Sequence, residues 1–230
     1  MAAGWSTNFT APNDGVFTVD DGDISHCPQC IDERADHVKF GSDGLVLELD
    51  QSPCNATAHS CCVNGTCAAY AAGHVRSANF QAFGRFTFVA RPSFPPLGSG
   101  APPQNAFACL TTSYYGSPHH EVASCFHGDS PTEVSLAFWS EPDNSVGKII
   151  TVDTGVLLHN DFHTYEVVWT PLLLTLSLDG VEIANATARA ANTTIPSIPG
   201  QVLLINRVMS NTYDGDASVA LRFASYVPLS

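Results

Sequence analysis

The sequence predicts an all-β fold in which two antiparallel sheets pack as a β-sandwich. Apolar and polar residues alternate with a period of two, as in Leu45–Asp50 and Arg85–Ala90, and successive side chains of a strand point to opposite faces. No segment has a convincing helical period. Many short strands punctuated by Gly and Pro favour two packed sheets.

Further elements follow from local signals. Leu174–Leu178 alternates and is followed by Asp179-Gly180, the two-residue turn that joins antiparallel strands. Val219–Val227 is expected to be a final strand. Gly and Pro mark loops at 93–103, 141–144 and 194–200. The polar, cysteine-rich segment Cys54–Cys67 is expected to be a disulfide-stapled loop.

The 230 residues are enough for one sizeable core, and we expect a single domain over residues 1–230, with no repeat and no linker. The 22 acidic residues against 9 basic ones give a net charge of −13, which repels phosphate backbones and argues against a nucleic-acid partner. The longest apolar stretch, Val167–Leu178, is interrupted by Pro171 and falls short of the roughly 18 residues of a membrane span.

Cysteines and glycosylation sequons together favour an extracellular or cell-surface location. Eight cysteines stand at Cys27, Cys30, Cys54, Cys61, Cys62, Cys67, Cys109 and Cys125. Asn-x-Ser/Thr occurs at Asn8, Asn55, Asn64, Asn185 and Asn192. The alternative is that the sequons are chance matches in a cytosolic protein.

The cysteines could also serve redox or zinc chemistry, since Cys27-Pro-Gln-Cys30 has the spacing of either motif. A redox motif of this kind would stand beside a βαβ unit, and the adjacent pair Cys61-Cys62 does not suit a zinc site. We therefore expect structural disulfides, with no metal and no cofactor. Connectivity stays open, although Cys109 and Cys125 flank one predicted hairpin and are a plausible pair.

Four segments in order carry a resemblance to a known family: Val75–Ser77, Phe83–Phe86, His119–Gly128 and Asp161–Gly180. Their order and spacing resemble glycoside hydrolase family 16, which includes laminarinases, lichenases, xyloglucan endotransglycosylases and fungal wall transglycosylases. The resemblance covers roughly residues 40–228. It implies a concanavalin-like jelly-roll sandwich and retaining attack on a β-glycosidic bond by two carboxyl groups.

The same resemblance maps the family's catalytic strand, Glu-x-Asp-x-Glu, onto residues 121–125 of this chain. Glu121 takes the nucleophile position, while Ala123 and Cys125 stand at the other two acidic positions. Neither residue replaces a carboxylic acid. His119, His120 and His127 lie nearby, and only His119 has the parity of Glu121, but we expect satisfied surface histidines rather than a substitute acid.

The sequence therefore predicts a catalytically inactive family-16-like domain that acts as a glycan-binding or structural module of a cell wall, surface coat or extracellular assembly. Its partners would be a polysaccharide or glycan, with self-association or an extracellular protein partner for the structural version. Tyr114, Tyr115 and Trp139 could bind sugar through their aromatic faces, or pack in the core. The alternative is a divergent hydrolase or transglycosylase with Glu121 as nucleophile.

Overall fold

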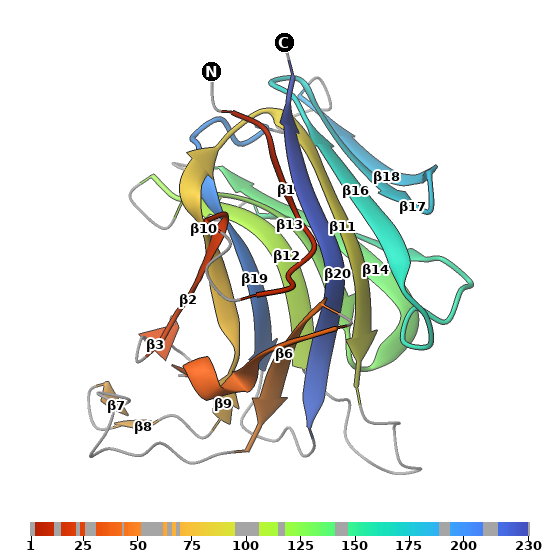
Figure 1. Cartoon of the computed structure of the whole chain (residues 1–230). Coiled ribbons are helices and arrows are strands. Elements are labelled where there is room, and N and C mark those ends of the chain that lie inside the picture. The colour runs from red at the N-terminus through yellow and green to blue at the C-terminus, as the bar shows by residue number, and fades with distance from the viewer. Residues whose placement is uncertain are drawn as a thin grey trace.

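The computed structural model describes residues 3–11, 15–21, 24–25, 31–42, 44–51, 62–63, 66–67, 70–94, 106–114, 118–140, 147–188, 194–208 and 216–229. Only the backbone is described at 24–25, 62–63, 66–67, 106–107, 111–114 and 206–208. These residues form an all-β jelly roll in which two large sheets face one another (Figure 1). The predicted fold class is confirmed, whereas the single domain over residues 1–230 stays a prediction.

The larger sheet has eleven strands among the described residues. Its order is β18 (Val181–Thr187), β17 (Leu173–Leu178), β16 (His163–Trp169), β11 (Gly84–Ser93), β20 (Ala217–Pro228), β6 (Gly44–Asp50), β9 (Tyr70–Ala72), β4 (Ile31–Glu33) and β3 (Ile24–Ser25). Two further strands pair off this path, β1 (Trp5–Thr7) with β20 and β5 (Val38–Gly41) with β6. The strands predicted at 45–50, 85–90, 174–178 and 219–227 all lie in this sheet.

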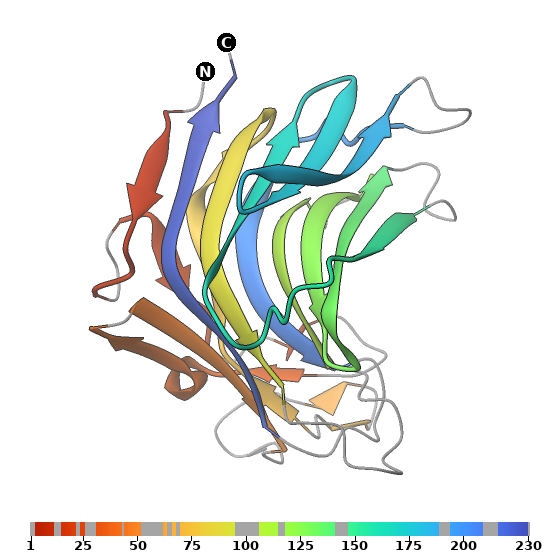
Figure 2. The same cartoon turned by 90° about the vertical axis from the view of Figure 1, so that its right-hand side faces the viewer.

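The second sheet has seven described strands. Their order is β15 (Lys148–Asp153), β14 (Ser130–Ser140), β13 (His120–His127), β12 (Ala106–Tyr114), β19 (Gly200–Val208), β10 (His74–Gln81) and β2 (Phe17–Val19). Its strands are bowed, and the hollow of the bend lies on the side away from the larger sheet (Figure 2). We call that side the outer face of the seven-stranded sheet.

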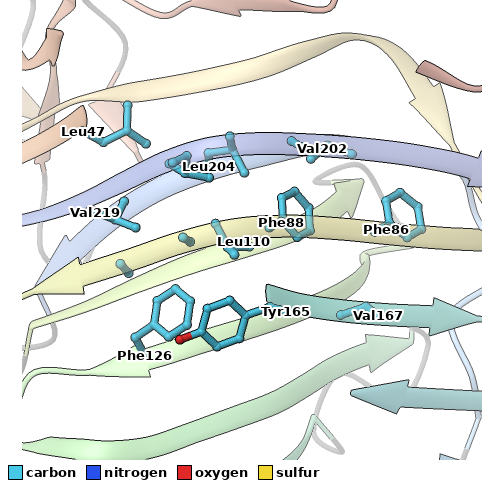
Figure 3. Packing of buried hydrophobic residues seen from close by; sticks show 14 of the residues in the cluster. Leu47, Phe86, Phe88, Leu110, Phe126, Tyr165, Val167, Val202, Leu204 and Val219 are labelled. Carbon is cyan, nitrogen blue, oxygen red and sulfur yellow. The ribbon is translucent and has the colours of Figure 1, made fainter. Parts of the chain in front are cut away.

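The core lies between the two sheets and consists of the inward residues of each strand. Phe126 of β13 meets Tyr165 of β16 with ring centroids 4.8 Å apart, and Leu110, Val202 and Leu204 of the smaller sheet lie opposite the larger one (Figure 3). All of these side chains are buried. Period-two alternation in the sequence therefore reflects one face of each strand packing into this core.

The hairpin between β17 and β18 has the predicted turn. Asp179 and Gly180 have φ values of 49° and 82°, the left-handed conformations that a type I′ turn requires at both central positions. Asp179 also ties this turn to the start of β16, since one carboxylate oxygen accepts the backbone N–H of Thr164 at 2.8 Å and the other lies 2.7 Å from Nδ1 of His163.

Three details differ from the sequence-based expectation. β4 and β9 run parallel, so the larger sheet is not purely antiparallel; the long connection between these strands provides the crossover that parallel pairing needs. A 3₁₀ turn, η1 (Ala35–His37), precedes β5. The segment Cys54–Cys67 contains a two-stranded ladder of β7 (Cys62–Val63) and β8 (Thr66–Cys67) rather than loop alone.

No helix in the described part of the chain is long and apolar enough to cross a membrane.

Candidate functional site

The outer face of the seven-stranded sheet holds the residues that the sequence singles out as catalytic positions. On β13 the side chains of Val122 and Phe126 pack into the core. Glu121, Ala123 and Cys125 alternate with them and therefore share the opposite, outer face. The backbone of β13 thus carries these three side chains along one line on the outer face, as the alternation predicts.

Cross-strand register builds a grid around this line. Glu121 lies opposite Trp139 of β14, and Ala123 lies opposite Ala137. Cys125 has Ser135 on one side and Cys109 of β12 on the other. Residues directly opposite each other on neighbouring strands place their side chains in contact distance, so the outer face is a continuous surface that spans β12, β13 and β14.

Cys109 and Cys125 form a disulfide across β12 and β13, with their Cα atoms 4.2 Å apart. This confirms the pairing that the predicted hairpin indicated. Cys125 is 8% exposed and Cys109 is 3% exposed, so the bond forms part of the floor of the outer face. Position 125, onto which the resemblance maps the third acidic residue of the family pattern, is therefore occupied by a cross-link that can neither donate nor accept a proton.

The floor around this disulfide is apolar. Cys109, Ala123, Cys125, Ala137, Leu203 and Ile205 form a second buried cluster, separate from the main core, and Trp139 packs against it. A solvent-facing side of an antiparallel sheet is ordinarily polar. Sequence reasoning missed the contribution of β19, since Val202–Ile205 is apolar on both faces and alternation gives no signal there.

Trp139 borders this floor beside Glu121 and is half-buried. Its indole lies directly against Gly147, where an added Cβ would be 2.0 Å from the indole Nε1. Only a residue without a side chain at 147 leaves the indole in this position. The structure therefore holds Trp139 on the outer face, and its ring is not part of the main core.

Glu121 has a histidine neighbour, since Nε2 of His119 lies 3.1 Å from its carboxylate. The other two nearby histidines have structural contacts. Nδ1 of the buried His120 accepts the backbone N–H of Ser197 at 3.0 Å, and Nε2 of His127 lies 2.7 Å from Oγ of Ser135. Of these three histidines, His119 pairs with the Glu121 carboxylate directly, whereas the contacts described for the other two are to serine residues.

On β10, Arg76 lies opposite Leu203 and His74 lies opposite Ile205. Their side chains therefore point to the same face of the sheet as the apolar floor. Nε of Arg76 donates to Asp20, which lies just after β2. Burial raises the pKa of Asp20, more than its basic neighbours lower it. Sequence analysis placed Arg76 in a family segment without assigning it to the site, and alternation around the buried Val75 was the signal that could have done so.

The remaining predicted site residues fall in different parts of the structure. Tyr114 ends β12, opposite His120, and only its backbone is described, whereas Tyr115 lies outside the described residues. Asn8 and Asn185 are exposed; Asn55, Asn64 and Asn192 lie outside the described residues. Cys62 and Cys67 are backbone partners across β7 and β8, and the described residues do not include Cys27, Cys30, Cys54 and Cys61.

The most specific part of the resemblance, Phe162–Gly180, supports the scaffold. Trp169 is 1% exposed, and its indole N–H donates to the carbonyl of Pro196 at 2.8 Å. Tyr165 is fully buried, and this burial raises the pKa of its phenol well above the usual value. Burial alone would raise the pKa of Asp179, but the Thr164 N–H and His163 lower it overall. These groups belong to the larger sheet and its turn, where they anchor strands, and they do not contribute to the outer face of the seven-stranded sheet.

Comparison with known proteins identifies the family of this chain. The family model described as glycosyl hydrolases family 16 matches residues 29–220. The chain belongs to glycosyl hydrolase family 16. This confirms the resemblance carried by the four sequence segments. No curated protein matches the chain.

Solved structures share the family 16 fold at low identity. A prokaryotic β-1,3-1,4-glucanase (lichenase) from a mouse hindgut metagenome is 18% identical, with a TM-score of 0.81 over 99% of this chain and 100% of the other. The β-glucanase of Bacillus licheniformis is 21% identical, with a TM-score of 0.80 over 99% of each chain. A Bacteroides ovatus family 16 protein in complex with a G4G4G3G product is 15% identical, with a TM-score of 0.71 over 97% and 99%.

Proposed function

We propose that this family 16 domain is a catalytically silent glycan-binding module that acts outside the cell, in a wall, a surface coat or an extracellular assembly. The observation that carries the proposal is the Cys109–Cys125 disulfide at the position where the family pattern has its acid/base carboxyl. The family 16 fold is kept, while the position that would protonate a leaving group holds a sulfur cross-link.

The missing acid argues against hydrolysis on chemical grounds. Retaining glycosidases need two carboxyl groups about 5 Å apart, one as nucleophile and one as acid/base. Glu121 is the one carboxylate among Glu121, Ala123 and Cys125, and loss of general acid/base assistance costs roughly 10²–10⁴-fold in rate. Pairing with His119 at 3.1 Å further occupies the Glu121 carboxylate.

Glycan binding is supported by the composition of the outer face. Sugar sites combine apolar or aromatic surface with a few polar groups that fix orientation. Here the half-buried Trp139 borders the apolar floor, with Glu121 beside it and Arg76 on the far side of β19. A related family 16 protein was solved with an oligosaccharide product, so this fold can accommodate a glucan chain.

An extracellular location is supported by two features. Disulfides persist in oxidising compartments and are rare in the cytosol, and Cys109–Cys125 is formed. Asn8 and Asn185, the two sequons whose side chains are described, are both exposed, as glycosylation requires.

The binding half of the proposal is tested on a glycan array and then by titration calorimetry with the best ligand. Trp139→Ala should weaken binding at least tenfold because it removes the aromatic face. The matched control is Phe162→Ala, which removes a half-buried aromatic that lies under Arg222 and Arg91 of the other sheet. The binding proposal would be contradicted if wild type and Trp139→Ala had equal affinity, or if the wild type bound no β-glucan, chitin or algal glycan. The second result would leave a structural role, which predicts self-association or a partner complex that size-exclusion chromatography can detect.

The catalytic half is tested with activated aryl β-glycosides and with polysaccharides. We expect no turnover above background by the wild-type protein. The competing function, a divergent hydrolase or transglycosylase that uses Glu121, predicts slow release of the aryl group that disappears in Glu121→Gln. Such Glu121-dependent release would overturn the silent assignment without affecting the binding result.

A further inference from the structure

Asp20, Glu33 and His74 meet at the end of the sandwich where the two sheets join. Asp20 follows β2 and His74 opens β10, both in the seven-stranded sheet, while Glu33 ends β4 in the larger one. Nδ1 of His74 lies 3.1 Å from Oδ2 of Asp20 and 2.9 Å from Oε2 of Glu33. One ligand atom from each of the three residues lies within 4.8 Å of the other two.

The cluster is almost fully buried, with 6% exposure for Asp20, 6% for Glu33 and 8% for His74. Among the described residues, neither ring nitrogen of His74 nor Oδ2 of Asp20 makes a well-formed hydrogen bond. Buried polar atoms ordinarily have such partners. His74 Nδ1 instead points between two carboxylates, and a single proton on that nitrogen cannot point at both of them.

The spacing of these atoms fits a metal ion. Adjacent ligands of an octahedral ion with bonds of about 2.1 Å are roughly 3.0 Å apart, and those of a tetrahedral zinc ion are slightly further apart. The two distances from His74 Nδ1, 2.9 and 3.1 Å, are of this size. Arg76 holds the other oxygen of Asp20 through its Nε, which keeps Oδ2 turned toward His74, as a supporting group orients a metal-binding carboxylate.

We infer that Asp20, Glu33 and His74 form a binding site for one divalent first-row transition-metal ion, with Zn²⁺ as the first candidate. Imidazole nitrogen with carboxylate oxygen suits Zn²⁺ and its neighbours, whereas Ca²⁺ takes six to eight oxygen ligands. Water molecules complete the coordination. Since Glu33 belongs to one sheet and the other two ligands to the second, the bound ion ties the sheets together. The site shares Arg76 with the proposed glycan-binding face, but the inference does not rest on that function.

The experiment uses the full chain after removal of metal with a chelator. Titration calorimetry with Zn²⁺ should give one site, and Glu33→Gln and Asp20→Asn should each weaken it at least 100-fold with unchanged circular dichroism. Saturating Zn²⁺ should raise the unfolding temperature of the wild type and not of Glu33→Gln. The matched control is His163→Ala, which breaks the histidine–carboxylate pair with the exposed Asp179 and should leave Zn²⁺ affinity unchanged.

A second readout needs no substitution. In wild-type protein with labelled histidine, the ring resonances of His74 should shift up to one equivalent of Zn²⁺ and then stop. The inference would be overturned if the wild type bound no stoichiometric Zn²⁺ or if the His74 resonances did not shift. Equal Zn²⁺ affinity in the wild type and Glu33→Gln would also overturn it. Those results would identify the cluster as an imidazolium paired with two carboxylates.

Discussion

Removal of the Cys109–Cys125 disulfide by the double substitution Cys109→Ala/Cys125→Ala should destabilise the protein substantially without changing its fold. The two cysteines are 16 residues apart, and a cross-link that closes a loop of this length stabilises by about 3 kcal/mol through the unfolded chain. For a chain of 230 residues this corresponds to a fall in unfolding temperature of roughly 6–12 °C.

The native strand pairing should survive this change because it does not depend on the sulfur atoms. β12 is also paired with β19 from Ala106 to Ser113, and β13 is paired with β14. The cross-link therefore adds little to the native register and acts mainly by restricting the unfolded state.

The assay is equilibrium unfolding in guanidinium chloride under non-reducing conditions, followed by both fluorescence and circular dichroism. The variant should have a lower midpoint and a slope at least as steep, because its unfolded chain is less compact. Cys109→Ser/Cys125→Ser serves as the control: it removes the same cross-link but buries two hydroxyl groups in the apolar floor, so its loss should be at least as large. A loss below about 1 kcal/mol in both variants would refute the argument that this bond restricts the unfolded chain.

Three further outcomes follow from the structure. Gly44→Ala should destabilise the protein far more than Gly155→Ala in thermal unfolding. Both glycines have positive φ, so either substitution costs about 1–2 kcal/mol of backbone strain, but a Cβ at position 44 would also lie 2.1 Å from a carbonyl oxygen of β20. Equal losses of stability in the two variants would contradict this contact. Trp169→Phe should cost about 2–4 kcal/mol in denaturant titrations, since the Pro196 carbonyl loses its buried donor; an unchanged midpoint would argue against that bond. The pKa of Asp179 is lowered in the folded protein, so the stability that its carboxylate contributes is present above the unfolded pKa of about 3.9 and is lost as pH falls through the folded value. The difference in unfolding free energy between wild type and Asp179→Asn should be constant near neutral pH and become smaller below about pH 4. A difference that grows in acid would contradict the lowered pKa.

Much of the fold could be predicted because its signals are local. The alternation of Leu45–Asp50 marks β6, and Asp179-Gly180 sets both ends of the β17–β18 hairpin through its turn conformation. The Cys109–Cys125 pair was accessible for the same reason, since two cysteines flanking one hairpin become neighbours once that hairpin forms.

Other features depend on contacts between distant segments and have no local signal. The parallel pairing of β4 with β9 joins segments that are far apart in the sequence, so it depends on tertiary packing. Leu203 and Ile205 form part of the apolar floor. Because β19 is buried on both faces there, its sequence does not alternate between apolar and polar residues. The cluster of Asp20, Glu33 and His74 combines three segments that look unrelated in sequence and meet only when both sheets have formed.

The disulfide on the floor of the outer face also limits how a carboxyl group could be introduced at position 125. A single Cys125→Glu change would put a carboxylate into a site that is now 8% exposed and would leave an unpaired Cys109 thiol beside it. Cys109 would have to change as well, and Ala123 would still lack a carboxyl group. Each single cysteine substitution would remove the disulfide before the pair of carboxyl groups needed for hydrolysis can act. In the silent role that we propose, the Cys109–Cys125 bond would therefore work against a gain of hydrolysis, because stability would be lost before catalysis could appear.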